Sequence, residues 1–185
     1  MTATGALILS FFALLWWVVG LRAAGHGPGM VYAVPIAVTA VLGLVARHVA
    51  RRRGDASDPN PAEEARRGRL VGWASAAEGI AIFVASNSLV NTGHADAIAP
   101  AIALIVGGHF VPLAWGLPAP AYYITAIILA ALGLAGLAVT DLSSRLTLVC
   151  AGAAGVLWLT ALVALTAGHL DHPLPKSTDD LEGQR

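Results

Sequence analysis

The sequence is poor in charge. Only 12% of its 185 residues are Asp, Glu, Lys or Arg, against roughly 25% in an ordinary soluble domain. Acidic and basic residues balance to a formal net charge of zero, which argues against a nucleic acid as partner. The chain has one cysteine, Cys150, so an internal disulfide is excluded. The apolar neighbours of this cysteine offer nothing that would activate its thiol.

Signatures of catalysis and of metal binding are also missing. The sequence contains no HExxH, GxSxG or CxxC motif and no carboxylate-rich cluster. These patterns mark metalloproteases, serine hydrolases and thiol or zinc sites. An intramembrane enzyme that works by acid–base chemistry alone remains a minor alternative. The sequence leaves the question of an enzyme open but favours a protein without a catalytic site, a metal or a cofactor.

Apolar residues are abundant instead. They make up 57% of the chain, and most charged residues gather in segments 47–69 and 171–185. A membrane-spanning helix needs about 20 mostly apolar residues. We therefore expect an all-α fold: a polytopic membrane protein forming a compact bundle of six transmembrane helices within residues 1–170. The predicted spans are about 5–23, 30–49, 70–91, 96–116, 120–140 and 146–168.

The segments between the spans predict an orientation. Residues 50–69 form the longest predicted loop, and arginines are concentrated in and beside it. The positive-inside rule places this loop in the cytoplasm, and six spans then place both termini there. The first apolar run lacks the basic start of a signal peptide, so we expect a retained helix. The tail, residues 171–185, is polar and expected to be disordered.

Small residues recur at the spacing that lets helices approach closely in lipid. They predict tight packing within the bundle, and such a face is also suited to joining two copies into a homo-oligomer. The residues are Ala33, Ala37, Ala40 and Gly43 in the second span, Ala126, Ala130, Gly133 and Gly136 in the fifth, and Ala151, Gly152 and Gly155 in the sixth.

Glycine precedes histidine at four places, and three of them end a predicted span. Glycine commonly ends a helix, and a histidine beside it can meet the last free carbonyls. Metal binding is the alternative for two groups, although neither has the spacing of a recognised metal motif. The first group is His26, His94 and Asp96, and the second is His169, Asp171 and His172.

His109 does not fit a helix end, because it lies roughly 12 Å inside the fourth predicted span. Pro112 has no N–H for the carbonyl of Gly108, so we expect a kink beside the imidazole. Glu78 lies at a similar depth in the third span, and consecutive antiparallel helices are usually neighbours. We therefore expect Glu78 and His109 to form a buried acid–imidazole pair. Ionisable residues at this depth are costly and indicate function.

The pair supports two interpretations. The first is binding or transport of a small solute or ion at Glu78 and His109, with Gly108, Pro112, Ser75 and Asn87 nearby. The second is a non-catalytic membrane subunit or assembly partner, in which the pair is a polar staple between helices. A haem carrier is a weaker idea, because bis-histidine ligation needs a second deep histidine. Membrane lipids are the expected partners beside that solute or ion.

The stretch from Ala77 to Leu137 resembles a group of small, uncharacterised bacterial multi-pass membrane proteins. The shared features are an intramembrane glutamate, a GxHFxPLA element and a helix that begins with two tyrosines. The residues that match are Glu78, Gly107, His109, Phe110, Pro112, Leu113, Ala114, Tyr122 and Tyr123. The resemblance covers the third to fifth spans. It implies a protein of the bacterial inner membrane and gives neither an activity nor a substrate.

Overall fold

The computed structural model describes residues 3–53, 60–117 and 119–167, and all regular structure in these ranges is helical. The predicted all-α fold is confirmed. Six of its stretches are long and apolar enough to cross a membrane. The elements are α1 (Ala3–Ala23), α2 (Pro28–Arg53), α3 (Pro61–Asn91), η1 (Ala95–Ala97), α4 (Ile98–Gly116), α5 (Ala121–Ala138), α6 (Leu142–Leu146), η2 (Thr147–Ala151) and α7 (Gly152–Ala167).

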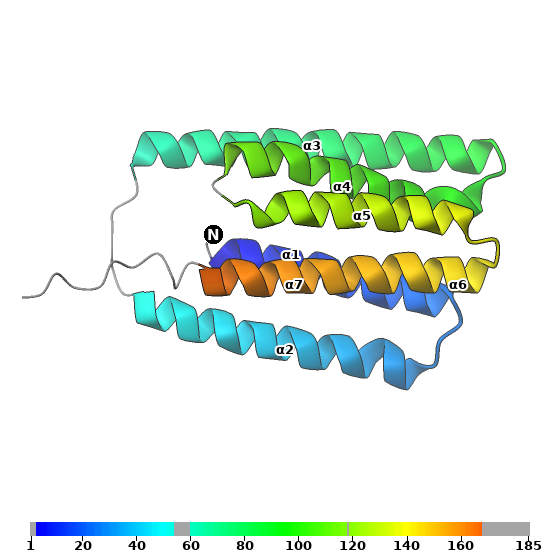
Figure 1. Ribbon diagram of the computed structural model, residues 1–185, viewed down its shortest axis with the longest axis horizontal. Helices are drawn as coiled ribbons and strands as arrows, with labels where there is room; N and C mark the ends of the chain where they lie inside the picture. The colour runs from blue at the N-terminus through cyan, green and yellow to red at the C-terminus, as the bar shows by residue number, and fades with distance from the viewer. Residues whose placement is uncertain (1–2, 54–59, 118, 168–185) are drawn as a thin grey trace, which may run out of the picture.

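The long helices run up and down beside one another (Figure 1). α4 packs on α5 on one side and on α3 on the other, while α1 packs on α7 and α2. Contacts of α5 with α7 join these two groups. α3 and α2 therefore lie at opposite edges of the bundle (Figure 1). The turns before α2, α4 and α6 share one end, and the starts of α1, α3 and α5 share the other (Figure 1).

Two helices extend into the predicted loop 50–69. α2 continues to Arg53, and α3 begins at Pro61 rather than near Leu70. The side chain of Asn60 caps α3 by accepting a hydrogen bond from the N–H of Ala62, at 3.1 Å. Proline is favoured in the first turn, because its missing N–H would be unpaired there anyway. The prediction of a loop over 61–69 is therefore wrong, and residues 54–59 lie outside the described part.

The last predicted span, 146–168, also starts earlier, at Leu142. Asp141 caps this end, because its carboxylate accepts a hydrogen bond from the N–H of Ser144, at 2.8 Å. A π-helical turn, η2, then leads into α7. Cys150 lies in this turn and is buried. A Cβ placed on Gly20 would lie 2.0 Å from the Cβ of Cys150, so α1 approaches η2 closely at this glycine.

Glycines also allow a close contact between α4 and α5. A Cβ on Gly107 would lie 2.9 Å from the carbonyl oxygen of Ala126, and one on Gly133 would lie 2.8 Å from that of Pro100. Backbone therefore meets backbone here, and the predicted packing through small residues of the fifth span is confirmed. A Cβ on Gly43 of α2 would meet nothing within 4 Å. The small residues of α2 are thus less engaged within this chain.

Aromatic packing fills the seam between α1 and α7. Trp158 is buried, and its ring centroid lies 5.6 Å from that of Trp17. Trp158 sits midway along a predicted span, too deep for an interfacial belt. Its contact with Trp17 explains this position as packing between two helices.

Candidate functional site

Glu78 of α3 and His109 of α4 meet where the two helices pack. The Nδ1 atom of His109 lies 3.5 Å from the Oε2 atom of Glu78. Their side chains retain only 10% and 19% of their exposure, respectively. The expected juxtaposition is therefore present: an acid and an imidazole face each other within an apolar helix pair.

The sequence of α3 explains why Glu78 faces α4. Half-buried residues recur along α3 at helical spacing, at Ala74, Glu78, Ala81 and Ala85. Side chains three or four residues apart share one face of a helix. Alanines on both sides of Glu78 let the backbones approach, so its carboxylate can reach the imidazole. Toward one end of α3, the side chain of Leu70 packs against Gly116 and holds the same face against α4.

An aromatic ring also contacts the imidazole of His109. The imidazole stands edge-on to Phe110, with ring centroids 5.8 Å apart. Phe110 in turn packs edge-on against Tyr122 of α5, at 5.4 Å. These two contacts link the imidazole, through Phe110, to α5. Within the described residues, Nδ1 of His109 is buried without a hydrogen-bond partner. The 3.5 Å approach to Glu78 is thus a close contact that becomes a hydrogen bond only after a small rotation of either side chain.

Two further predicted site residues, Gly108 and Pro112, lie on the exposed side of α4. The helix is continuous from Ile98 to Gly116, so Pro112 does not end it. Pro112 nevertheless removes the N–H that the carbonyl of Gly108 would accept in a regular helix. The predicted kink remains a prediction. A Cβ on Gly108 would meet nothing within 4 Å, so it is Gly107 that the packing requires to be glycine.

Ser75 and Asn87, the remaining predicted site residues, are exposed on α3. Ser75 lies less than one turn from Glu78. The side-chain amide of Asn87 donates to the carbonyl of Phe83 in its own helix, at 2.8 Å. Asn87 lies roughly 13 Å along the helix from Glu78, at 1.5 Å per residue. The arrangement therefore centres the candidate site on Glu78 and His109.

Two of the hollows on the described surface lie away from the pair. One, of about 440 Å³, lies between one end of α3 and the turn from α4 to α5. The other, of about 550 Å³, lies beside Leu44, Val45, Arg47 and His48 of α2. Neither is lined by Glu78 or His109.

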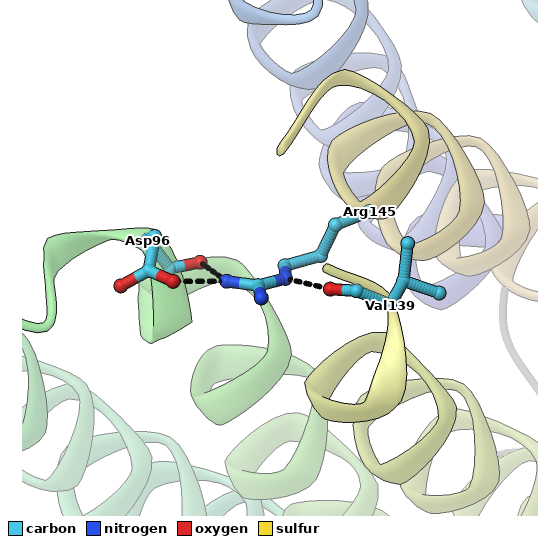
Figure 2. Close-up of polar contacts among 3 residues, drawn as sticks. All are labelled: Asp96, Val139 and Arg145. Atoms are coloured by element: carbon cyan, nitrogen blue, oxygen red, sulfur yellow. Dashed lines mark hydrogen bonds and ion pairs between the residues drawn. The ribbon is translucent and has the colours of Figure 1, made fainter. Parts of the chain in front are cut away.

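A second ionic contact, which the sequence analysis missed, ties two turns together at the other end of the bundle (Figure 2). Arg145 of α6 is buried, with 8% of its surface exposed. Its Nε donates to the carbonyl of Val139, at 2.8 Å, and its Nη1 donates to the carbonyl of Asp96, at 3.1 Å. Nη1 also forms an ion pair with the Asp96 carboxylate. A lone arginine at the edge of an apolar run was the only signal in the sequence.

The glycine–histidine pairs end helices as expected at two places. Gly25 and Gly93 adopt positive φ angles, 83° and 78°, a conformation that glycine tolerates best. The imidazole of His26, however, contacts a hydroxyl group of another helical segment. Its Nε2 lies 2.9 Å from the hydroxyl of Thr147, which links the α1–α2 turn to η2.

The structure contradicts one proposed metal group. No three His, Cys, Asp or Glu side chains of the described residues lie close enough together to hold a metal ion. The imidazole of His26 contacts the hydroxyl of Thr147, and the carboxylate of Asp96 forms an ion pair with Arg145. The other proposed group, His169, Asp171 and His172, lies outside the described residues.

Comparison with known proteins gives a family but no activity. The family of unknown function DUF7010 matches residues 62–167, more than half of the chain. No curated protein and no solved structure matches the chain. The matched segment contains Glu78 and His109 as well as Asp96 and Arg145. The expectation of an uncharacterised family is confirmed, whereas the GxHFxPLA element and a bacterial origin stay predictions. The chain belongs to the DUF7010 family.

Proposed function

We propose that the protein is a six-span integral membrane protein that binds or transports a small solute or ion at Glu78 and His109. The observation that carries this proposal is the 3.5 Å approach of a carboxylate and an imidazole between two apolar helices. Such groups are costly in a membrane and usually serve a transported or bound species.

The exposed surface supports a membrane location. On α3, the side chains of Ile80 and Phe83 are 65% and 69% exposed, and no described residue of this helix is buried. Apolar side chains are also exposed along α1 and α5, such as Phe11 and Ile127. A water-soluble monomer rarely exposes apolar surface on this scale. Lipid would cover these helices.

The charges at the two ends support an orientation in a bacterial inner membrane. Arg47, Arg66, Arg67 and Arg69 belong to the end of the bundle where α1 starts and α7 finishes (Figure 1). The opposite end carries Arg22 and Arg145, and the latter is neutralised by Asp96. By the positive-inside rule, we propose that the end with more arginines is cytoplasmic and that both termini lie on that side.

The chemistry of the pair favours a proton or a small cation over an anion. A carboxyl group and an imidazole together can offer oxygen and nitrogen lone pairs, and either group can hold a proton. Because each group changes charge on protonation, one proton at this site alters the attraction for any second ion. Coupling of proton binding to the movement of a small solute is therefore within the reach of these two residues.

A second candidate is a non-catalytic membrane subunit in which Glu78 and His109 form a polar staple. Two observations favour it. The side chains of Glu78 and His109 are largely buried, and α3 leaves a long apolar side uncovered within this chain. A neighbouring membrane protein or a second copy would then cover α3 or the small residues of α2.

Proton flux into liposomes tests the proposal. Wild type would be reconstituted with a pH-sensitive dye inside, and flux would be followed after an imposed pH gradient. Glu78→Gln removes the ionisable carboxyl group with little change in size, and we expect it to abolish flux. Glu64→Gln removes the same charge from the exposed end of α3 and should leave flux unchanged. Equal flux in wild type and Glu78→Gln would contradict transport through this site and favour the staple.

A further inference from the structure

The hollow between α3 and the α4–α5 turn brings basic and aromatic side chains together. It has a volume of about 440 Å³, and Arg66 and Arg67 of α3 line one side of it. Trp115, Pro120 and Tyr123 line the other. It exists because α3 begins at Pro61 and so extends past the end of α4. The first turns of α3 therefore stand beside the α4–α5 turn.

The side chains that line this hollow carry a net positive charge. Arg67 is held by Glu63, with Nη2 and Oε1 2.6 Å apart. Within the described part of the chain, Arg66 forms no ion pair or hydrogen bond through its side chain. Two arginines against one glutamate leave an excess of positive charge. A guanidinium presents its donors in a planar fork that matches a phosphate.

The other wall has the character of a membrane interface. Trp115 is 87% exposed and Tyr123 is 39% exposed. Tryptophan and tyrosine gather at the level of lipid headgroups, because their rings are apolar and their N–H or O–H is polar. Leu117 and Ala114 add apolar surface beside them. A ligand here would find positive charge at one side and apolar or aromatic contacts at the other.

We propose that this hollow binds the phosphate of an anionic lipid headgroup. The arginines take the phosphate, and the Trp115 side of the hollow contacts the glycerol and the start of the acyl chains. This inference rests on the membrane location proposed above but does not depend on transport by Glu78 and His109. A free phosphate would use the arginines alone, whereas the exposed apolar wall fits a lipid.

Titration of the purified full-length protein in neutral detergent tests this site. The probes are short-chain phosphatidylglycerol, short-chain phosphatidylcholine and inorganic phosphate, with binding followed by calorimetry. We expect phosphatidylglycerol to bind, phosphatidylcholine to bind at least tenfold more weakly, and inorganic phosphate not to displace the lipid. Arg66→Gln should weaken phosphatidylglycerol binding about tenfold. Surface attraction alone would account for about fivefold per charge, on the order of 1 kcal/mol.

Arg69→Gln is the matched control, because it removes the same charge from the same helix at a residue that does not line the hollow. It should weaken binding at most about fivefold, the loss that surface attraction alone explains, and Glu78→Gln should bind the lipid as wild type does. Displacement of the lipid by inorganic phosphate would keep phosphate as the ligand but overturn its assignment to a lipid. Equal losses in Arg66→Gln and Arg69→Gln, or no binding by wild type, would overturn the site itself.

Discussion

The Nδ1 atom of His109 lies 3.5 Å from the carboxylate of Glu78, across the contact between α3 and α4. α3 packs mainly on α4, so this polar contact lies in the main interface that holds α3 in the bundle. The pair thus has a structural consequence whether or not it also binds a ligand. Stability and flux measurements on the same variants separate the two roles.

Stability should show coupling between the two side chains. In detergent, Glu78→Ala and His109→Ala should each lower the free energy of unfolding, and the double variant should lose less than the sum. Polar contacts between helices in a membrane average about 0.6 kcal/mol and reach about 1.7 kcal/mol. Unfolding in mixed SDS micelles would measure this coupling. Strictly additive losses would mean that the two side chains do not interact in the folded protein.

The double glycine of α4 offers a sharp test of helix packing. A Cβ on Gly107 would lie 2.9 Å from the carbonyl oxygen of Ala126 and 3.0 Å from the backbone nitrogen of Ala130. Backbone atoms cannot move aside as a flexible side chain can, so Gly107→Ala should cost about 1–3 kcal/mol by overpacking.

Gly108→Ala is the control for that change, because the added methyl would meet nothing within 4 Å. Alanine is the better helix former, so this variant should be neutral or more stable by about 0.5–1 kcal/mol. Thermal unfolding of both variants in detergent would compare them. Similar melting temperatures for the two variants would show that α4 and α5 are not in close backbone contact at Gly107.

The six apolar helices could be predicted because a run of about 20 apolar residues has few other uses. Hydropathy marks only the apolar part of a helix, however. It missed the charged first turns of α3, although Asn60 and Pro61 are ordinary start signals for a helix. Glu78 and His109 could be paired by depth, because they lie on consecutive antiparallel helices.

Contacts between distant helices could not be predicted in this way. Arg145 and Asp96 are 49 residues apart, and their meeting depends on how the α5–α6 turn lies against the start of α4. Thr125 and Thr160, whose hydroxyl oxygens lie 2.6 Å apart inside the bundle, join α5 to α7 in the same way. Helix order in a bundle leaves no local pattern in a single sequence, so the position of Arg145 could be noticed but neither contact could be assigned its partner.

Acid should remove one source of stability at the start of α6. Hydrogen bonds from Ser144, above all from its backbone N–H, hold the pKa of Asp141 below its ordinary value of 3.8. The charged cap therefore stabilises the folded state above that value, and its contribution is lost as the pH falls through the lowered pKa. Asp141→Ala should thus unfold at a lower temperature than wild type at neutral pH, and the difference should shrink below pH 3.8.

Asp141→Asn separates the cap from its charge, because asparagine caps a helix about as well as aspartate but does not titrate. It should lie close to wild type at neutral pH. Melting curves of the three proteins over a pH series would provide the comparison. A gap between wild type and Asp141→Ala that stays constant into strong acid would mean that the Asp141 charge does not stabilise this turn.

Arg145 should matter more for stability than its partner Asp96. Arg145 is buried and donates to two backbone carbonyls as well as to the carboxylate, whereas the side chain of Asp96 is 51% exposed. Arg145→Met leaves the carbonyls of Asp96 and Val139 without these donors and should cost about 3 kcal/mol. Asp96→Asn keeps an acceptor beside the guanidinium, so its effect should be smaller.

Arg145→Lys tests whether the positive charge alone is needed at this position or whether the separate hydrogen-bond donors of the guanidinium are needed as well. Lysine keeps the positive charge, but a single ammonium group cannot reproduce the separate directions in which Nε and Nη1 donate. We therefore expect Arg145→Lys to recover less than half of the stability that Arg145→Met loses, measured by unfolding in mixed micelles. Full recovery by lysine would show that charge alone holds the two turns together, and the hydrogen bonds to Asp96 and Val139 would then be dispensable.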